Sequence, residues 1–163
     1  LLYSLYSSSA EILSSWIKSL PPTPEGCHLL NLAASHDGVG LTWCAQILSA
    51  EQLRSLCESA RARGGIVQTR RPTAVSTEAE AVPWEINITY FSACAPDPSD
   101  NSASALDRMR LHVNRFLATQ SIVVALKGVP ALYFSLFVAG ENDIDGIEQI
   151  RASRRDPDAH CIE

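Results

Sequence analysis

Two short apolar segments most constrain the fold of this chain: CHLLNLA at 27–33 and GVPALYF at 128–134. A helical pattern precedes each of them, and no tight turn joins one to the other. Parallel strands need a crossover connection, usually a helix, whereas antiparallel neighbours are joined by short hairpins. The order helix, strand, mixed region, long helix, strand therefore predicts an α/β protein with a parallel sheet. Continuous apolar runs also predict strands that are buried on both faces.

Three helices are predicted by periodicity and by capping residues. Apolar side chains recur at helical spacing over 1–20, although a run of serines breaks the pattern in the middle and two prolines end it. Ser49 is the expected N-cap of a helix over 49–63, which two glycines stop. The third helix begins at Ser102 or Ser104 and grows more apolar toward its end. We expect it to face solvent first and to be buried last.

The region between the second and third helices is expected to lie over the surface. From Gly65 to Pro83 the chain is rich in Ser, Thr and Pro, and 93–104 has the composition of a loop. The segment 86–91 is β-prone. Farther on, Ala131–Phe134 is expected to form the second buried strand. Two strands cannot complete a sheet, so the pattern predicts missing partners along open, apolar edges.

The composition excludes several classes of protein. Hydrophobic residues make up 46% and charged residues 19% of the 163 residues, which suits one globular domain with a sizeable core. The net charge is −5 and no basic block occurs, so nucleic acid is not an expected partner. The chain shows neither a signal peptide nor an uninterrupted apolar stretch of the ~20 residues that a membrane span needs. We therefore expect no membrane partner.

Five cysteines are widely spaced and form no C-x-x-C pair, which argues against a disulfide framework and against a zinc site. They are Cys27, Cys44, Cys57, Cys94 and Cys161. We expect buried, reduced thiols in a cytoplasmic protein, and no cofactor. The chain opens on a helical pattern without an initiator Met, so we also expect it to be a piece of a longer protein.

The first apolar segment runs into NLAASHDGVGL, where His36 and Asp37 stand at the exit of the predicted strand. In an α/β barrel such exits build the active site, because the strands themselves are packed core. A carboxylate there can stabilise developing positive charge, and an imidazole can donate to a sugar hydroxyl. The alternative is that Asp37 and Gly38 make a polar turn and that His36 is a satisfied loop residue. On pattern alone the plain turn is the favoured interpretation.

Three other motifs have both a functional and a structural interpretation. Trp84 and Glu85 place an aromatic platform beside a carboxylate, as sugar sites do, but Trp84 is as easily a core anchor under a long loop. ENDIDG at 141–146 has closely spaced carboxylates, yet it lacks the closing Glu of an EF-hand, which favours a solvated loop over a calcium site. Asn87 starts an N-x-T sequon, which we discount because nothing else indicates secretion.

Four segments carry a resemblance to a known family: SLPPTPEGCHLLNLAASHDGVGL, VPWEINITYF, LKGVPALYF and AGENDIDGIEQ. Together they resemble the C-terminal part of the catalytic barrel of sucrose-phosphorylase-like enzymes, a branch of the α-amylase glycoside hydrolase superfamily. The resemblance runs from residue 1 to about Arg154 and implies an incomplete (β/α)8 TIM barrel. It implies a sixth helix at 1–20, a seventh strand at 27–33, a lid-like loop insertion at about 42–100, a seventh helix at 104–127, an eighth strand at 129–134 and a divergent tail at 155–163.

The resemblance implies roles for residues named above. In the family, the His-Asp pair after the seventh strand contacts the donor sugar and supplies the third catalytic carboxylate. By this resemblance His36 binds substrate and Asp37 stabilises the transition state, which reverses the preference for a plain turn. Trp84 and Glu85 match acceptor-loop positions where sucrose phosphorylases usually carry Tyr and Gln. The altered pair leaves the acceptor open, and enzymes acting on glucosylglycerate or sucrose 6'-phosphate also fit.

Two departures from the family limit what this chain is expected to do. Retaining chemistry needs a nucleophile and an acid/base carboxyl about 5–5.5 Å apart, and the family keeps both on earlier strands, before residue 1. The closing R-x-I-N-R motif of the family is lost after Arg154. We expect a parent enzyme that transfers glucose between an α-glucoside such as sucrose and inorganic phosphate, with hydrolysis left open. We expect the isolated chain to be inactive.

Other hypotheses stay open beside this one. One is a non-catalytic module that binds carbohydrate or that completes a split enzyme with a separately encoded N-terminal half of the barrel. Another is a gene remnant without function. An upstream coding sequence that carries the missing carboxylates would distinguish among them.

Overall fold

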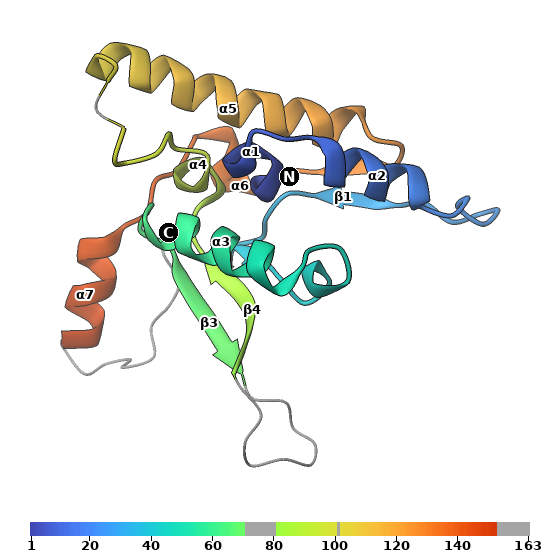
Figure 1. Ribbon diagram of the computed structural model, residues 1–163, viewed down its shortest axis with the longest axis horizontal. Coiled ribbons are helices and arrows are strands. Elements are labelled where there is room, and N and C mark those ends of the chain that lie inside the picture. The colour runs from blue at the N-terminus through green and yellow to red at the C-terminus, as the bar shows by residue number, and fades with distance from the viewer. Residues whose placement is uncertain (71–80, 101, 153–163) are drawn as a thin grey trace.

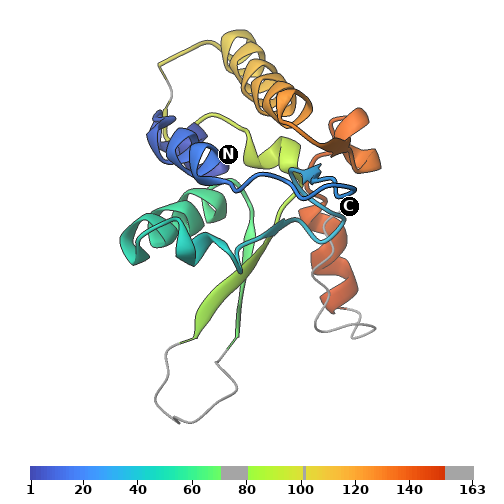
Figure 2. The same ribbon diagram turned by 90° about the vertical axis from the view of Figure 1, so that its right-hand side faces the viewer.

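The computed structural model describes residues 1–70, 81–100 and 102–152 as an α/β arrangement (Figure 1). Its elements are α1 (Leu2–Ser7), α2 (Glu11–Ser19), β1 (Leu30–Leu32), β2 (Val39–Gly40), the 3-10 helix η1 (Cys44–Gln46), α3 (Ala50–Arg61), β3 (Ile66–Arg70), β4 (Val82–Asn87), α4 (Tyr90–Ala93), α5 (Ala105–Ala125), β5 (Val129–Ala131), α6 (Phe134–Phe137) and α7 (Ile144–Ala152). The long helix α5 lies along one side, while β3 and β4 extend away from the helices (Figure 1 and Figure 2). None of the described helices is long and apolar enough to cross a membrane.

β1 and β5 form a two-stranded parallel sheet, as the order of elements predicts. Leu30 pairs with Val129, and the chain between the two strands, including α5, is the crossover. Asn31 in the middle of β1 donates its side-chain amide to the carbonyl of Leu126 at 3.0 Å and to that of Val123 at 3.4 Å. Carbonyls at the end of a helix lack partners within it, so β1 fixes the place where α5 ends.

The two strands are exposed, which corrects the prediction that they are buried on both faces. Leu30 is 68% exposed and Val129 is 53% exposed, because each strand has a neighbour along one edge only in the described chain. β5 also ends at Ala131, and Phe134 is the first residue of α6, so the prediction of a strand reaching Phe134 is wrong. The prediction that open edges expose apolar side chains is confirmed.

β2, β4 and β3 form a second, antiparallel sheet in that order, which the sequence pattern does not predict. Residues 66–70 belong to β3, although their composition predicts part of a polar surface excursion. β4 covers Val82–Asn87, so the strand starts before the β-prone segment, and Thr89 caps α4 instead of continuing it. All five residues of β3 are only partly buried or exposed. Pairing with β4 therefore holds this strand, and apolar periodicity does not reveal it.

Local capping signals correctly predict where the helices begin. Ser49 and Gln52 form a reciprocal capping box at the start of α3, and Ser104 caps α5. Ser8 adopts a left-handed conformation with φ of 53° and separates α1 from α2. Near the end of α5 only the side that carries Val123 is buried. The prediction that this helix is buried toward its end therefore holds for that side only.

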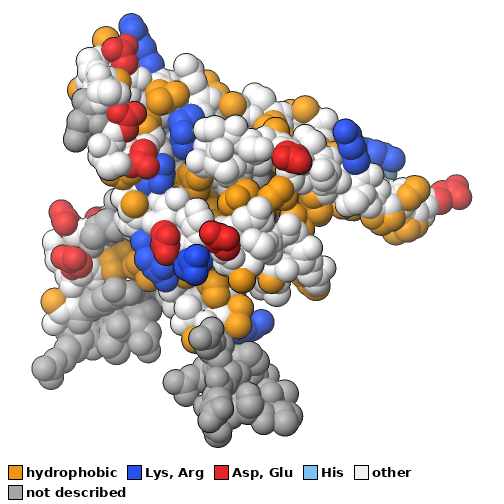
Figure 3. Space-filling view, in the orientation of Figure 1, with side chains coloured by type: hydrophobic (Ala, Val, Ile, Leu, Met, Phe, Trp, Pro, Cys, Tyr) orange, Lys and Arg blue, Asp and Glu red, His pale blue; other side chains and the backbone are white. Residues whose placement is uncertain are grey.

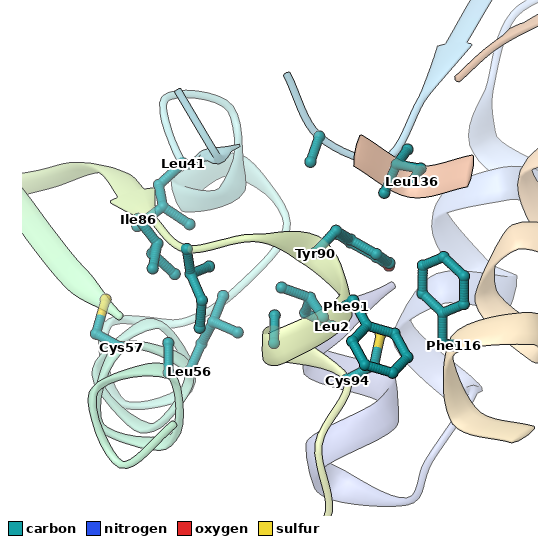
Figure 4. Close-up of a cluster of buried hydrophobic side chains, with 14 of the residues drawn as sticks. Leu2, Leu41, Leu56, Cys57, Ile86, Tyr90, Phe91, Cys94, Phe116 and Leu136 are labelled. Atoms are coloured by element: carbon teal, nitrogen blue, oxygen red, sulfur yellow. The ribbon is translucent and has the colours of Figure 1, made fainter. Parts of the chain in front are cut away.

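The buried core includes most of the short helix α4 (Figure 4). Distant side chains donate hydrogen bonds to the carbonyl of its last residue and to those of the two residues that follow. Tyr6 of α1 donates its hydroxyl to the carbonyl of Ala93 at 2.8 Å. Nε of Arg115, in α5, donates to the carbonyl of Cys94 at 2.8 Å. Nε of Arg63, just after α3, donates to the carbonyl of Ala95, also at 2.8 Å. The last carbonyls of a helix have no partner inside it. These bonds therefore join α1, α3 and α5 around α4.

An aromatic cluster adds to the contact between α4 and α5 (Figure 4). Phe91 stacks on His112 with ring centroids 4.0 Å apart, and it meets Phe116 edge to face at 5.3 Å. His112 Nε2 also donates to the carbonyl of Phe91 at 2.7 Å. Aromatic pairs at such distances stabilise beyond the area that they bury, so α5 is held to α4 by apolar and polar contacts together.

The cysteines differ in burial, so the expectation of buried thiols holds in part. Cys57 and Cys94 are buried, whereas Cys27 is exposed; all are free thiols. Burial raises the pKa of the Cys94 thiol to about 11. Because the thiolate is the nucleophile, Cys94 is unreactive at neutral pH. Cys161 lies outside the described residues.

We predict that iodoacetamide at neutral pH modifies Cys27 well before Cys94 in the folded chain. The exposed thiol is accessible, while the buried one is both protonated and shielded. Timed labelling followed by peptide mass spectrometry measures both rates, and the same labelling in denaturant is the control, where the two rates should converge. Similar rates in native buffer would contradict the burial of Cys94.

We also predict that Tyr6→Phe lowers the free energy of unfolding by about 1–2 kcal/mol, because the buried carbonyl of Ala93 loses its donor. Tyr3→Phe is the control in the same helix, since its hydroxyl makes no hydrogen bond to the described residues; we expect a change within about 0.5 kcal/mol. Urea denaturation followed by circular dichroism measures both. Equal effects of the two substitutions would show that the bond to α4 is unimportant.

Candidate functional site

The segment 35–38 after β1 is a hydrogen-bonded turn. The side chains of His36 and Asp37 make no hydrogen bond to the backbone of this turn. Ser35 and Gly38 exchange backbone hydrogen bonds of 3.0 and 3.1 Å. The hydroxyl of Ser35 accepts from the backbone N–H of Asp37 at 3.2 Å. In many turns an Asp carboxylate does this work itself. Here the serine does it, so the turn leaves the carboxylate of Asp37 available to other groups.

His36 and Asp37 lie side by side on the turn and face solvent. Nε2 of His36 is 3.2 Å from Oδ2 of Asp37, and the two side chains are 65% and 41% exposed. At such exposure an ion pair adds little to stability. Both side chains therefore face solvent and neither belongs to the core.

Strand β4 packs against this turn and hydrogen-bonds to it. Gly38 has φ of 110°, and a Cβ atom there would lie 2.2 Å from the carbonyl oxygen of Ile86. Glycine is required on both counts, since other residues rarely adopt this φ. The side-chain Nδ2 of Asn87 donates to the carbonyl of Asp37 at 2.7 Å. The backbone that carries Asp37 is thus packed and hydrogen-bonded against β4.

Tyr133 joins the site from the second parallel strand. It follows β5 as His36 follows β1, and the ring centroids of Tyr133 and His36 are 6.2 Å apart with a 53° angle between the planes. The carboxyl ends of parallel neighbours meet at one edge of a sheet. That rule was sufficient to find Tyr133 from the sequence, but the prediction of a strand continuing to Phe134 concealed it.

The structure separates Trp84 and Glu85, which the sequence pairs. Oε2 of Glu85 accepts from Nδ2 of Asn87 at 3.2 Å, so Glu85 belongs to the same hydrogen-bonded group as Asp37. Trp84 lies at a bulge in the pairing of β4 with β3, and the guanidinium of Arg70 lies 5.6 Å from its ring centroid. Trp84 is only half-buried and is therefore not the core anchor of the structural interpretation.

The sequence suggested for Asn87 only a glycosylation sequon, but the structure places its side chain between Asp37 and Glu85. Its side chain is fully buried, so an oligosaccharide cannot be attached to it in this fold, in agreement with the discounted sequon. The only sequence signal for its role is its place two residues after Glu85. On a strand such residues share a face.

The ENDIDG segment has a structural function in the described chain. Oδ1 of Asn142 accepts from the backbone N–H of Thr89 at 2.8 Å, and Oδ1 of Asp143 accepts from that of Gly146 at 2.9 Å, at the start of α7. The prediction of a solvated loop is wrong for its second half, which is helical. Among the described residues no three His, Cys, Asp or Glu side chains gather to hold a metal ion.

A groove of about 440 Å³ is lined by residues of β1 and of neighbouring elements. Leu30 of β1 and Trp16 of α2 line it, and Figure 3 shows hydrophobic side chains gathered between the α1–α2 segment and α3. Neither His36 nor Asp37 lines the groove, so it is separate from the candidate site.

The chain is similar in sequence to curated phosphorylases, although no protein-family model matches it. It is 31% identical to a glucosylglycerate phosphorylase of Spirochaeta thermophila over 142 residues, which are 87% of this chain and 22% of that protein. It is 27% identical to a glucosylglycerate phosphorylase of Escherichia coli and 26% identical to a sucrose phosphorylase of Streptococcus mutans, in each case over 94% of this chain. It covers 25% and 27% of those two proteins.

A solved structure has a similar fold. The sucrose 6F-phosphate phosphorylase of Thermoanaerobacter thermosaccharolyticum matches 92% of this chain with a TM-score of 0.69 and 20% identity. The match covers 27% of that protein. The resemblance drawn from the four sequence segments is confirmed, and the chain spans about a quarter of the length of the relatives that it matches.

We predict that Gly38→Ala lowers the free energy of unfolding by about 2 kcal/mol or more, because it combines a strained φ with a clash against β4. Gly40→Ala is the control two residues away, where a Cβ meets nothing within 4 Å; we expect a change within about 1 kcal/mol. Denaturant titration measures both variants. Equal stability would contradict the close packing of the turn on β4.

Proposed function

The chain belongs to the sucrose-phosphorylase-like enzymes of the α-amylase superfamily and matches about a quarter of their length, so we propose that it is a portion of a glucoside phosphorylase. The parent reaction is transfer of a glucosyl group between an α-glucoside and inorganic phosphate. One observation carries the proposal: the His36–Asp37 pair stands on a glycine-dependent turn at the carboxyl end of β1. Active-site groups of α/β barrels occupy this position.

In this function each residue of the site has a role that follows from its chemistry. The carboxylate of Asp37 stabilises the positive charge of the oxocarbenium-like transition state, and the imidazole of His36 binds the glucosyl ring. Trp84 and Glu85 shape the acceptor side. Glu85 has the stronger support, because it shares a hydrogen-bonding partner with the Asp37 turn.

The same proposal assigns the elements to places in an incomplete (β/α)8 barrel. In this assignment α1 and α2 are the sixth helix, β1 is the seventh strand, α5 is the seventh helix and β5 is the eighth strand. The insertion at about 42–100 is a lid-like addition that contains β3 and β4, two of the three strands of the antiparallel sheet. The segment 155–163 is a divergent tail outside the described residues. The parallel pairing of β1 with β5 across α5 supports it.

For the substrate we propose glucosylglycerate before sucrose. Three of the five curated relatives are glucosylglycerate phosphorylases, including the protein with 31% identity. The departure of Trp84 and Glu85 from the residues usual in sucrose phosphorylases supports an acceptor other than fructose. Sucrose and a phosphorylated sucrose are the other candidates to assay.

A second candidate function has an observation of its own. The groove along β1 and the exposed Leu30 are an apolar surface next to an open strand edge. Such an edge pairs readily with another strand. We propose that this surface receives the remaining, N-terminal part of the barrel, either covalently or as a separate chain. A module that only binds carbohydrate has no comparable support.

We predict that the purified chain does not release glucose 1-phosphate from glucosylglycerate and phosphate, because retaining chemistry needs two further carboxylates. Activity is expected when the chain replaces its matching segment in the Spirochaeta thermophila relative, or when it is mixed with the rest of that protein. In the active form, Asp37→Asn should lower kcat at least a hundredfold or so.

Asp145→Asn is the matched control, since this exposed carboxylate lies at the start of α7, and its activity should stay within about twofold. Turnover by the chain alone would refute the prediction of inactivity. An active chimera that tolerates Asp37→Asn would refute the assigned role of Asp37.

A further inference from the structure

Asn87 lies between the Asp37 turn and Glu85 and contacts both. Its Nδ2 donates to the backbone carbonyl of Asp37 at 2.7 Å and to Oε2 of Glu85 at 3.2 Å. A side-chain amide carries two N–H donors, so the two bonds form together. The residue is 0% exposed, and water therefore does not compete for these donors.

The backbone under Asp37 is held from two sides as a result. The amide of Asn87 holds the carbonyl of Asp37, and the main chain of Ile86 fills the space where Gly38 has no side chain. A catalytic side chain has to be held within about 0.5 Å of its productive position. The carboxylate of Asp37 is partly exposed and is not held by packing. Its position therefore depends on how firmly the Asp37 backbone is held.

The other side-chain atom of Asn87 indicates that the amide is present for its donors. Oδ1 is buried and has no hydrogen-bond partner among the described residues. A buried, unsatisfied acceptor lowers stability. A leucine of similar size would fill the space without that cost, so packing does not explain an asparagine here. The two donated bonds do.

We propose that Asn87 is a positioning residue that sets the place of Asp37 and couples it to Glu85. The proposal rests on the function proposed above for Asp37, and it deepens that function by linking the donor side of the site to the acceptor side. Asn87 acts through the Asp37 carbonyl and does not touch substrate. Loss of its donors displaces the turn while the sheet around it persists.

The first test uses the chain itself and needs no activity. Asn87→Asp keeps the size of the side chain but points a carboxylate at two acceptor oxygens. We expect amide hydrogen exchange at Gly38, measured by NMR, to accelerate at least about tenfold. Exchange at Leu41, whose N–H donates to Trp84 in the same sheet, should change less than about twofold.

Two further variants make this test decisive. Glu85→Gln keeps an acceptor for Asn87 and should leave exchange at Gly38 within about twofold of the parent chain. Asn87→Ala removes the donors without adding charge and should reproduce the acceleration at Gly38. Equal acceleration at Gly38 and Leu41 in both Asn87 variants would reduce Asn87 to a structural residue, and no acceleration would overturn the proposal.

The second test uses the chimera with the Spirochaeta thermophila relative. Asn87→Ala should lower kcat at least about tenfold with KM for phosphate within about twofold, because the transition state loses a placed carboxylate while ground-state binding persists. A parallel rise in KM would overturn the positioning role. If the unsubstituted chimera is inactive, the function proposed for Asp37 fails, while the exchange experiment still decides whether Asn87 fixes the turn.

Discussion

Three successive backbone carbonyls at the end of α4 receive hydrogen bonds from side chains that are far away in sequence. Tyr6 comes from α1, Arg63 from the residue pair after α3, and Arg115 from the middle of α5. A buried carbonyl without a donor is costly, so these three segments can pack together only where those donors reach α4. The stacking of Phe91 on His112 strengthens the same junction.

This junction determines where β4 lies, because β4 leads into α4 through Ile88 and Thr89. With β4 in place, the carbonyl of Ile86 meets Gly38, and the amide of Asn87 reaches the carbonyl of Asp37. The turn directly follows β1 in sequence, but its position depends on contacts with β4, which is far from it in sequence. Packing around α4 thus influences, through β4, the position of the exposed Asp37 carboxylate that is proposed to act in catalysis.

The open sheet is the other side of this arrangement. β1 and β5 pair with each other and leave apolar side chains exposed, and the groove along β1 continues that surface. Proteins about four times as long match this chain over nearly all of its length. The proposed place of the chain in a larger barrel explains both facts, since a further parallel strand would cover the free edge of β1.

The sequence by itself determined the features that depend on neighbouring residues: the caps at Ser49 and Ser104, the turn at Asp37 and Gly38, and the parallel order of the two apolar segments. It did not predict β3, whose polar residues pair with a strand beyond an intervening segment, nor the end of β5 before Tyr133. Only the tertiary structure decided that Asn87 joins Asp37 to Glu85 and that Trp84 lies apart from them. Caps and turns are satisfied within a few residues, whereas pairing, burial and the meeting of donors with acceptors depend on which distant segments come together.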